Sequence, residues 1–326
     1  MVAPLLFWGN LQAQNKSGYY INWNVDHTER QVKPSIPISA QEAKVINCYY
    51  VKFNSRNRLE SVKFYYQGKP SKYGDFGAHE MIRTYSKNHF TETYRNIDGK
   101  AVANNRGIYK QVFYLNSKGF WSKKQYFNQQ NQPIAQGKIA EVHTIRDAQN
   151  RAISEIQLGL KGDTIPDVNG FKTPYFAFTK DGFALYRQNR NPQGQLINGD
   201  KGYAVVNFLF DGNGNFVNEE FRDAKGNLFA YPGYARINFR EFNKYGKPAR
   251  IYFLDKMGRP LQTWAYGVVQ YYPNMNRKSI TFYDNQGNKS ATPQGTSTII
   301  YKYDSEGKFV GRERYDVKGK KINNPK

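Results

Sequence analysis

The stretch from Phe210 to Pro260 reads FDGNGNFVNEEFRDAKGNLFAYPGYARINFREFNKYGKPARIYFLDKMGRP and contains one pattern several times. An aromatic segment ends in Asp or Asn, and Gly follows three residues later. Gly214 and Gly226 are 12 residues apart, Gly226 and Gly246 are 20 apart, and Gly246 and Gly258 are again 12 apart. Aromatic segments punctuated by Asp, Asn and Gly are typical of strands joined by tight turns. The stretch therefore predicts a repeating β-structure.

The same spacing continues in both directions along the chain when Asn is allowed in place of Gly. Successive first turns are 30 to 32 residues apart. The turn pairs are Asn57/Gly68, Asn88/Gly99, Gly119/Asn131, Asn150/Gly162, Gly182/Gly194, Gly214/Gly226, Gly246/Gly258, Asn276/Gly287 and Gly307/Gly319. We therefore predict nine repeats between residues 45 and 322, preceded by a leader or cap at 14–44 and followed by a tail at 323–326.

Turn chemistry explains why Gly and Asn alternate at these positions. Gly adopts positive φ freely, and Asn does so more readily than most residues. An Asp or Asn three residues earlier can accept a backbone N–H two residues on, which closes a type I turn with a bulge. We expect the structural turn residues to include Gly214, Gly226, Gly246, Gly258, Gly287, Gly307 and Gly319.

The longer interval in each repeat contains a third turn and then another strand. This turn is predicted at Gly77, Gly107, Gly137, Gly170, Gly202, Gly233, Gly267 and Gly295. In the segment YARINFREF, residues 234–242, apolar residues alternate with polar ones. This alternation predicts a strand with one buried and one solvent-exposed face. Each repeat is thus a hairpin plus a connecting arm, and it must bury its apolar face against its neighbours.

The YDxxG phrases, such as Tyr303 to Lys308, resemble the tandem β-hairpin repeats of the MORN-like families, including the YwqK-type antitoxin repeats. They are also similar to the YD repeats of large secreted bacterial toxins and, less closely, to aromatic cell-wall-binding repeats. The resemblance covers residues 45 to 322. It implies a scaffold that contacts protein, lipid or glycan rather than a catalyst.

The charge of the chain is strongly positive. It has 326 residues with 48 Lys and Arg against 26 Asp and Glu, a net charge of +22. Such a charge attracts anionic polymers and lipids, although scattered basic residues can also simply solubilise a sheet and protect its edges. Dense basic clusters occur only at Lys123 with Lys124 and around Lys318 to Lys321, so nucleic acid stays open as a partner but is not favoured.

The N-terminus reads MVAPLLFWGNLQA over residues 1–13. We interpret it as the remnant of a secretory signal peptide, and a first strand or leader of a cytoplasmic protein is the alternative. The single cysteine, Cys48, excludes an internal disulfide, which suits a bacterial periplasm or surface. No segment is apolar enough to predict a transmembrane span.

No motif predicts a reaction, a cofactor or a metal. The four histidines, His27, His79, His89 and His143, show no metal-ligand spacing, and Cys48 lies in an aromatic segment where a small buried residue fits best. Residues 211–215 imitate the start of a calcium loop, but position 216 is Phe where that loop needs Gly. We predict no catalytic residues and no metal site.

Aromatic residues interleaved with basic ones are the remaining candidates for a site. Ring faces could stack on sugars while Lys or Arg meet anionic groups, although most rings of such a repeat should fill its core. The ligand-binding residues that we predict are Trp121, Lys123, Lys124, Tyr126, Trp264, Tyr266, Tyr271 and Tyr272.

Together these patterns predict an all-β, elongated array of about nine hairpin repeats in a mostly antiparallel, twisted or spiral sheet. We expect an exported, non-enzymatic scaffold in the periplasm or on the bacterial surface. It would bind an anionic or glycan-rich envelope component, or a protein partner. The alternative is an intracellular partner-binding repeat protein of antitoxin or effector type.

Overall fold

The computed structural model of the chain describes residues 16–25, 32–74, 76–167, 169–179, 183–231 and 233–322. Its strands form one antiparallel sheet of 25 strands. Those residues contain no α-helix and one short 3-10 turn, η1 (Glu42–Lys44). The all-β array of hairpin repeats predicted from the sequence is confirmed. Residues 1–13, where we predicted a signal peptide, lie outside the described part.

Nine hairpins, each of two long strands, make up most of the sheet. They are β3 (Cys48–Phe53) with β4 (Leu59–Tyr66), β6 (Glu80–Tyr85) with β7 (His89–Arg95), β9 (Lys110–Leu115) with β10 (Trp121–Phe127), β12 (Glu141–Arg146) with β13 (Ala152–Leu158), β15 (Pro174–Phe178) with β16 (Ala184–Asn189), β17 (Val205–Phe210) with β18 (Phe216–Arg222), β19 (Arg236–Phe242) with β20 (Pro248–Leu254), β21 (Tyr266–Tyr271) with β22 (Arg277–Tyr283), and β23 (Thr298–Tyr303) with β24 (Phe309–Tyr315).

Shorter elements complete the sheet. Five hairpins are followed by a two-residue strand: β5 (Lys69–Pro70), β8 (Ala101–Val102), β11 (Pro133–Ile134), β14 (Thr164–Ile165) and β25 (Lys321–Ile322). Before the first hairpin, β1 (Gly18–Val25) pairs with both β2 (Val32–Ile38) and β3. The predicted leader therefore contributes strands to the same sheet.

The turns have the chemistry that the sequence predicted. At the turn between β17 and β18, Oδ1 of Asp211 accepts the backbone N–H groups of Asn213 (2.9 Å) and Asn215 (2.8 Å). Gly214 has φ +78°, and the register shifts at Phe210 as a bulge requires. The seven glycines named above have φ between +67° and +88°. An Asx side chain accepts backbone N–H groups in the same way at Asn54, Asn96, Asn116, Asp147, Asp255, Asp284 and Asp304.

Three predicted turn residues are corrected by the structure, and a fourth, Gly182, lies outside the described part. In the eighth hairpin Met275 has positive φ (+67°), one residue before the predicted Asn276. Asn88 does not adopt positive φ, because the Ser86 N–H closes a tighter turn on the His89 carbonyl (2.8 Å). Gly267 pairs with Phe282 inside β21, where a Cβ would lie 2.9 Å from Ile280, so the glycine permits close packing.

The connecting arms fold back over one face of the sheet and close the core. Buried arm residues include Phe76, Phe171, Tyr203 and Trp264, which pack on buried strand residues of the neighbouring hairpins. The buried apolar residues of these strands therefore lie between the sheet and the arms. Cys48 is fully buried and free, and burial raises the pKa of its thiol to about 12.

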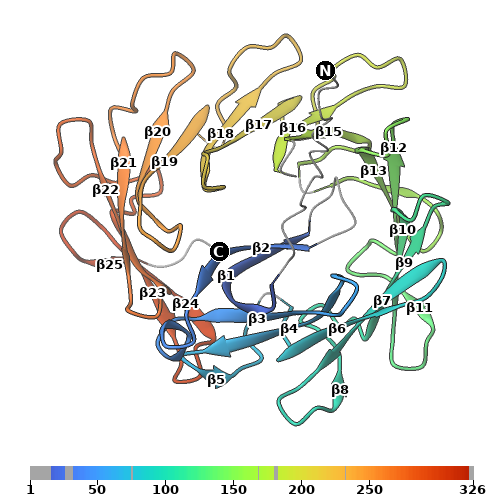
Figure 1. Cartoon of the computed structure of the whole chain (residues 1–326). Coiled ribbons are helices and arrows are strands. Elements are labelled where there is room, and N and C mark those ends of the chain that lie inside the picture. The colour runs from blue at the N-terminus through green and yellow to red at the C-terminus, as the bar shows by residue number, and fades with distance from the viewer. Residues whose placement is uncertain are drawn as a thin grey trace, which may run out of the picture.

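The array of hairpins curls until the last hairpin, β23–β24, lies beside the first, β3–β4, with β1 and β2 inside the curl (Figure 1). No ladder of strand hydrogen bonds joins the described ends, so the sheet itself stays open. Side chains and turns connect the two ends of the array instead, and we call this contact region the joint. The Asn47 backbone N–H donates to the Asn274 carbonyl (3.2 Å), and the Asn47 amide donates to Oδ1 of Asn276 (2.8 Å).

Three further contacts hold the joint. Lys244 and Tyr245, in the turn between β19 and β20, both bind Oε1 of Glu42, with the Lys244 Nζ at 2.7 Å and the Tyr245 hydroxyl at 3.1 Å. Gly307, in the turn between β23 and β24, packs on the ring of Tyr66, where a Cβ would lie 2.2 Å from ring carbons. The curl therefore depends on turns that approach η1 and β4 closely.

Candidate functional site

Alternation along each strand produces two different faces. In β20, Ile251 and Phe253 are buried against the arms, and Arg250 and Tyr252 point the other way. We call the first side of the sheet the core face and the second side the open face. Because no arm covers the open face, its side chains are the ones that a ligand can reach along many hairpins.

A row of tyrosines crosses three neighbouring strands on the open face. Tyr252 and Tyr266 are cross-strand partners with ring centroids 5.6 Å apart, and Tyr266 stacks on its next partner, Tyr283, at 5.3 Å and 15°. The Arg250 guanidinium lies 5.7 Å from the Tyr266 ring centroid, and its Nε pairs with Oε1 of Glu241 at 3.1 Å. All three rings are half-buried. We call Tyr252, Tyr266 and Tyr283 the tyrosine row.

A second group of tyrosines lies on the open face near the start of the array. The Tyr19 ring meets Tyr50 at 5.0 Å and Tyr65 at 5.9 Å, and the three line a groove of ≈ 490 Å³. Two lysines of this groove are neutralised by acids: Lys52 binds Glu60 (2.6 Å), and Lys63 lies 3.6 Å from Glu80. Arg95 also lines this groove, is exposed and has no ion pair among the described residues, so the groove is aromatic and keeps one uncompensated cation.

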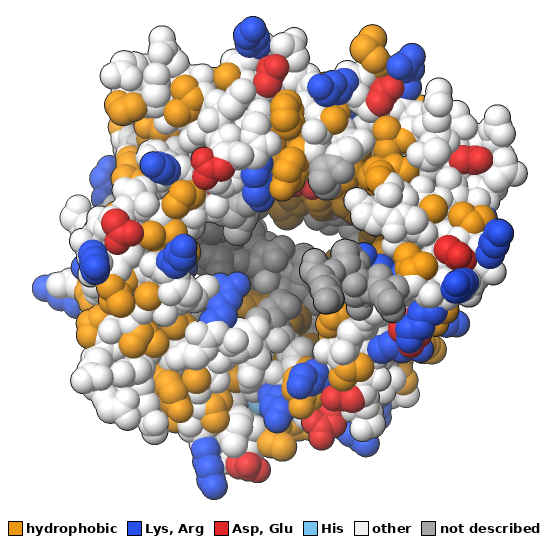
Figure 2. Space-filling view, turned by 180° about the vertical axis from the view of Figure 1, so that it is seen from behind, with side chains coloured by type: hydrophobic (Ala, Val, Ile, Leu, Met, Phe, Trp, Pro, Cys, Tyr) orange, Lys and Arg blue, Asp and Glu red, His pale blue; other side chains and the backbone are white. Residues whose placement is uncertain are grey.

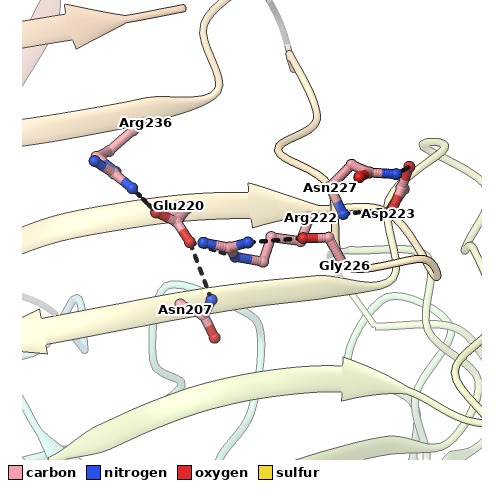
Figure 3. Close-up of polar contacts among 7 residues, drawn as sticks. All are labelled: Asn207, Glu220, Arg222, Asp223, Gly226, Asn227 and Arg236. Atoms are coloured by element: carbon pink, nitrogen blue, oxygen red, sulfur yellow. Dashed lines mark hydrogen bonds and ion pairs between the residues drawn. The ribbon is translucent and has the colours of Figure 1, made fainter. Parts of the chain in front are cut away.

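Charges are also compensated on the open face between β17 and β19 (Figure 3). Glu220 accepts from Arg236 and from the Arg222 Nε (2.5 Å), and the Asn207 amide donates to it at 3.3 Å. Burial alone would raise the pKa of Glu220, but these hydrogen bonds and charges lower it overall. Arg222 also donates to the Gly226 carbonyl (2.7 Å), so this cluster braces the turn rather than presenting free cations.

The positive charge is spread over the surface. Figure 2 shows Lys and Arg side chains distributed around the curl, with hydrophobic side chains between them and acidic side chains beside several of them. On that face they do not gather into one dense patch. The large net charge therefore acts as a diffuse field with local aromatic surfaces inside it.

The predicted ligand-binding residues separate into core and surface. Trp121, Tyr126 and Trp264 are 7%, 3% and 9% exposed and belong to the core, so the prediction of a ligand platform on these rings is corrected. The alternation that buries Tyr126 also turns Lys124 to the core face, where its Nζ lies 5.4 Å from the Tyr126 ring. Lys123 points to the open face above the Tyr114 ring at 4.6 Å.

The other predicted residues surround β21. Tyr266 belongs to the tyrosine row, the Tyr271 hydroxyl donates to the Pro248 carbonyl (2.9 Å) in a groove on the core face, and Tyr272 packs on Tyr303 at 6.3 Å. The structure does not bring this group together with the residues of β10, because the two hairpins lie on opposite sides of the curl (Figure 1).

The sequence analysis missed Tyr252 and Tyr283. Both follow the rule that a tyrosine beside a core phenylalanine, here Phe253 or Phe282, points to the open face. Their alignment with Tyr266 depends on the register across three strands. That register is set by arm length, which the aromatic composition does not reveal.

The described residues contain no group of three or more His, Cys, Asp and Glu side chains that could hold a metal ion. His79 is buried, with Nδ1 3.0 Å from the Phe64 carbonyl, and His143 pairs with Glu141 at 2.8 Å. Within the same residues, no helix has the length and apolarity to span a bilayer.

No protein-family profile and no curated protein matches the chain. Among solved structures, it is similar to a chain of the Photorhabdus luminescens Tc holotoxin pore, with TM-score 0.34, 10% identity, and 89% of this chain but 15% of that chain covered. A TcdB2–TccC3 structure gives TM-score 0.24, 10% identity, and coverage of 89% and 19%. A porin-like protein from Bacteroides uniformis gives 0.26, 8% identity, and coverage of 71% and 86%. These likenesses are too distant to assign a family or an activity.

Proposed function

We propose that the protein is a non-enzymatic repeat scaffold that binds an acidic glycan of the bacterial envelope through the open face of its sheet. The observation that carries the proposal is the tyrosine row with Arg250 beside it. Flat tyrosine rings stack on the apolar faces of sugars. The ion pair of Arg250 with Glu241 is solvent-exposed and therefore weak, so Arg250 can exchange Glu241 for a sugar carboxylate. A repeated sheet presents such contacts at a spacing that suits a polymer.

The net charge of +22 supports a polyanionic ligand. A diffuse positive field raises the local concentration of an acidic polymer and accelerates its association without requiring one dense patch. Such binding displaces counterions, so its affinity falls steeply as salt rises. A neutral glycan held only by ring stacking would show little salt dependence.

Export is part of the same proposal. An envelope ligand requires passage through the inner membrane, and the apolar segment at residues 1–13 supports removal of a signal peptide. The resemblance of the YDxxG phrases to MORN-like repeats, which implies a contact scaffold rather than a catalyst, also supports the proposal. Cell fractionation with N-terminal sequencing of the mature protein tests export, and an intact N-terminus on cytoplasmic protein would contradict it.

A protein partner is a second candidate, because the outer turns carry exposed apolar side chains. Ile97, Leu160, Met257 and Val317 are 61%, 67%, 75% and 45% exposed, each within the turn that follows the second strand of its hairpin. Exposed apolar residues at repeated positions are typical of contact surfaces. This candidate includes the intracellular antitoxin-like or effector-like alternative.

Binding of the purified chain to immobilised acidic and neutral glycans, over a series of salt concentrations, tests the main proposal. We expect retention on acidic glycans that weakens with salt. Tyr266→Ala should reduce it by about tenfold, because ring stacking is worth about 1–3 kcal/mol per ring. Tyr266→Phe keeps the ring and should bind like wild type. Equal binding by Tyr266→Ala, or no retention on any glycan, would contradict the proposal and favour the protein partner.

A further inference from the structure

A groove of ≈ 540 Å³ opens on the core face beside the turns that join β19 to β20 and β21 to β22. Seven of its thirteen lining residues are aromatic, among them Phe239, Tyr271, Tyr301 and Phe309, and none belongs to an arm. Phe309 is 51% exposed, so the groove is accessible. Its volume is within the range of about 300–1,000 Å³ that is usual for small-ligand sites.

Arg277 occupies a position in this groove that is apolar in the other eight hairpins. Arg277 pairs with Tyr271, the last residue of the first strand of its hairpin. The equivalent position in every other hairpin is the residue that pairs with the last residue of that hairpin's first strand. The other hairpins place apolar residues there, including Leu59, Trp121, Phe216 and Phe309. One repeat has therefore replaced a packing residue by a permanent cation, which repeat packing alone does not require.

The structure leaves the Arg277 guanidinium incompletely bonded. Its Nη1 donates to the Tyr301 hydroxyl (3.3 Å), and its centre lies 5.3 Å from the Tyr301 ring centroid. Its Nε is buried with no hydrogen-bond partner, and no ion pair of Arg277 occurs within the described residues. The adjacent Asn276 Nδ2, which also lines the groove, is buried without a partner too. Buried donors without acceptors are unfavourable and are completed by a water, an ion or a ligand.

We propose that this groove binds a carboxylate attached to a six-membered ring, with the carboxylate on the Nε side of Arg277 and the ring between the aromatic walls. An arginine binds a carboxylate through two parallel N–H groups, and the Nε side is the free one. One guanidinium without an ion pair suits a single negative charge, and the tyrosine and phenylalanine faces suit the face of a six-membered ring. The ring could belong to an acidic sugar or to an aromatic acid. The groove lies on the face opposite the tyrosine row, so this inference does not depend on the proposed function.

Titration calorimetry on the full chain with small probes tests the proposal. The acids are sodium glucuronate and sodium benzoate, the neutral controls are glucose and benzyl alcohol, and inorganic phosphate is the control for any anion. We expect at least one acid to bind about tenfold or more tightly than its neutral counterpart, as a charge-assisted hydrogen-bond pair predicts. Binding of glucuronate alone identifies a sugar acid, and binding of benzoate alone identifies an aromatic acid.

Variants at the site then separate binding from folding. Arg277→Leu should fold, since Leu59 occupies the same position in the first hairpin, and should lose acid binding. Arg277→Lys keeps the charge but not the paired N–H groups, so it should bind more weakly than wild type. Lys318→Leu removes one exposed charge at the other end of β24 and should bind like wild type.

Three results would overturn the proposal. The first is that neither acid binds to folded wild-type protein. The second is that Arg277→Leu retains the affinity of wild type, with a normal thermal transition. The third is that phosphate binds as tightly as the acids, which would show an anion site with no role for the ring.

Discussion

Arg83 in β6 and Arg277 in β22 lie on the core face of the same sheet, but the chain handles their charges differently. The Arg83 side chain is 3% exposed, and its Nη2 binds Oε1 of the cross-strand Glu92 at 2.6 Å. Arg277 has a tyrosine hydroxyl and no carboxylate among the described residues. On this face an arginine charge is neutralised within its hairpin at Arg83, where the pair serves stability, and is left open to a groove at Arg277.

The largest effect should come from breaking the Arg83 pair. Arg83→Leu leaves Glu92 buried without its counterion, and we expect the free energy of unfolding to fall by about 3–5 kcal/mol. Urea unfolding followed by tyrosine fluorescence measures it. Replacing both residues by Leu should recover most of the loss, because the pair is then removed together with its desolvation cost. A double variant as unstable as the single one would contradict this reading.

The joint beside the Arg277 groove gives the next largest effect. Gly307 and Gly226 have the same φ, +84°, but a Cβ on Gly307 would lie 2.2 Å from Tyr66, whereas nothing lies within 4 Å of a Cβ on Gly226. Gly226→Ala should therefore show only the strain of positive φ, about 1–2 kcal/mol. Gly307→Ala should lose a further ~1–3 kcal/mol from overpacking. Equal losses in thermal unfolding would show that the joint does not contribute to stability.

Arg277→Leu should have a smaller effect on stability, and of opposite sign to that of Arg83→Leu. It removes a half-buried charge that has no ion pair and restores the residue type of the other hairpins, so we expect stability to stay unchanged or to rise by about 1 kcal/mol. Urea unfolding under the conditions used for Arg83→Leu provides the test. A loss as large as that of Arg83→Leu would mean that Arg277 is structural, and the contrast between the two arginines would disappear.

The smallest effect concerns pH at the joint. The hydrogen bond from Lys244, then those from Ser39 and Tyr245, lower the pKa of Glu42 from 4.5 to about 2. A carboxylate with a lowered pKa stabilises the fold fully above its unfolded pKa and loses that contribution as pH falls toward its folded pKa. The melting temperatures of wild type and Glu42→Gln should therefore converge between pH 5 and pH 2. A constant difference over that range would contradict a role for the Glu42 carboxylate.

Much of the fold was predictable because turn chemistry is local. Asp211 and Gly214 lie three residues apart, and both the hydrogen bonds and the positive φ of that turn follow from the two residue types alone. Asn276 shows the limit of the approach. Met275 adopts the left-handed conformation there although it is a poor residue for it, because the strands on either side and the joint fix that turn.

The candidate site was less predictable, since it depends on which side of a strand each ring faces and on which strand is its neighbour. Trp121 and Tyr126 are adjacent to lysines in the sequence, but alternation and a bulge after Trp121 turn both rings into the core. Tyr252, Tyr266 and Tyr283 are far apart in the sequence and meet through strand register. Aromatic content therefore indicated a binding surface without identifying its residues.

The sequence by itself determined the nine hairpins, most of their turns and the all-β class, because positive φ and Asx hydrogen bonds act over four or five residues. Only the tertiary structure decided that the sheet curls until its ends meet, through Asn47, Glu42 and Tyr66. It also decided that Arg277 lies half-buried, with no carboxylate partner among the described residues. The contacts of the joint connect residues more than 200 positions apart. They depend on the twist that accumulates along the sheet and on burial, which no local sequence pattern encodes.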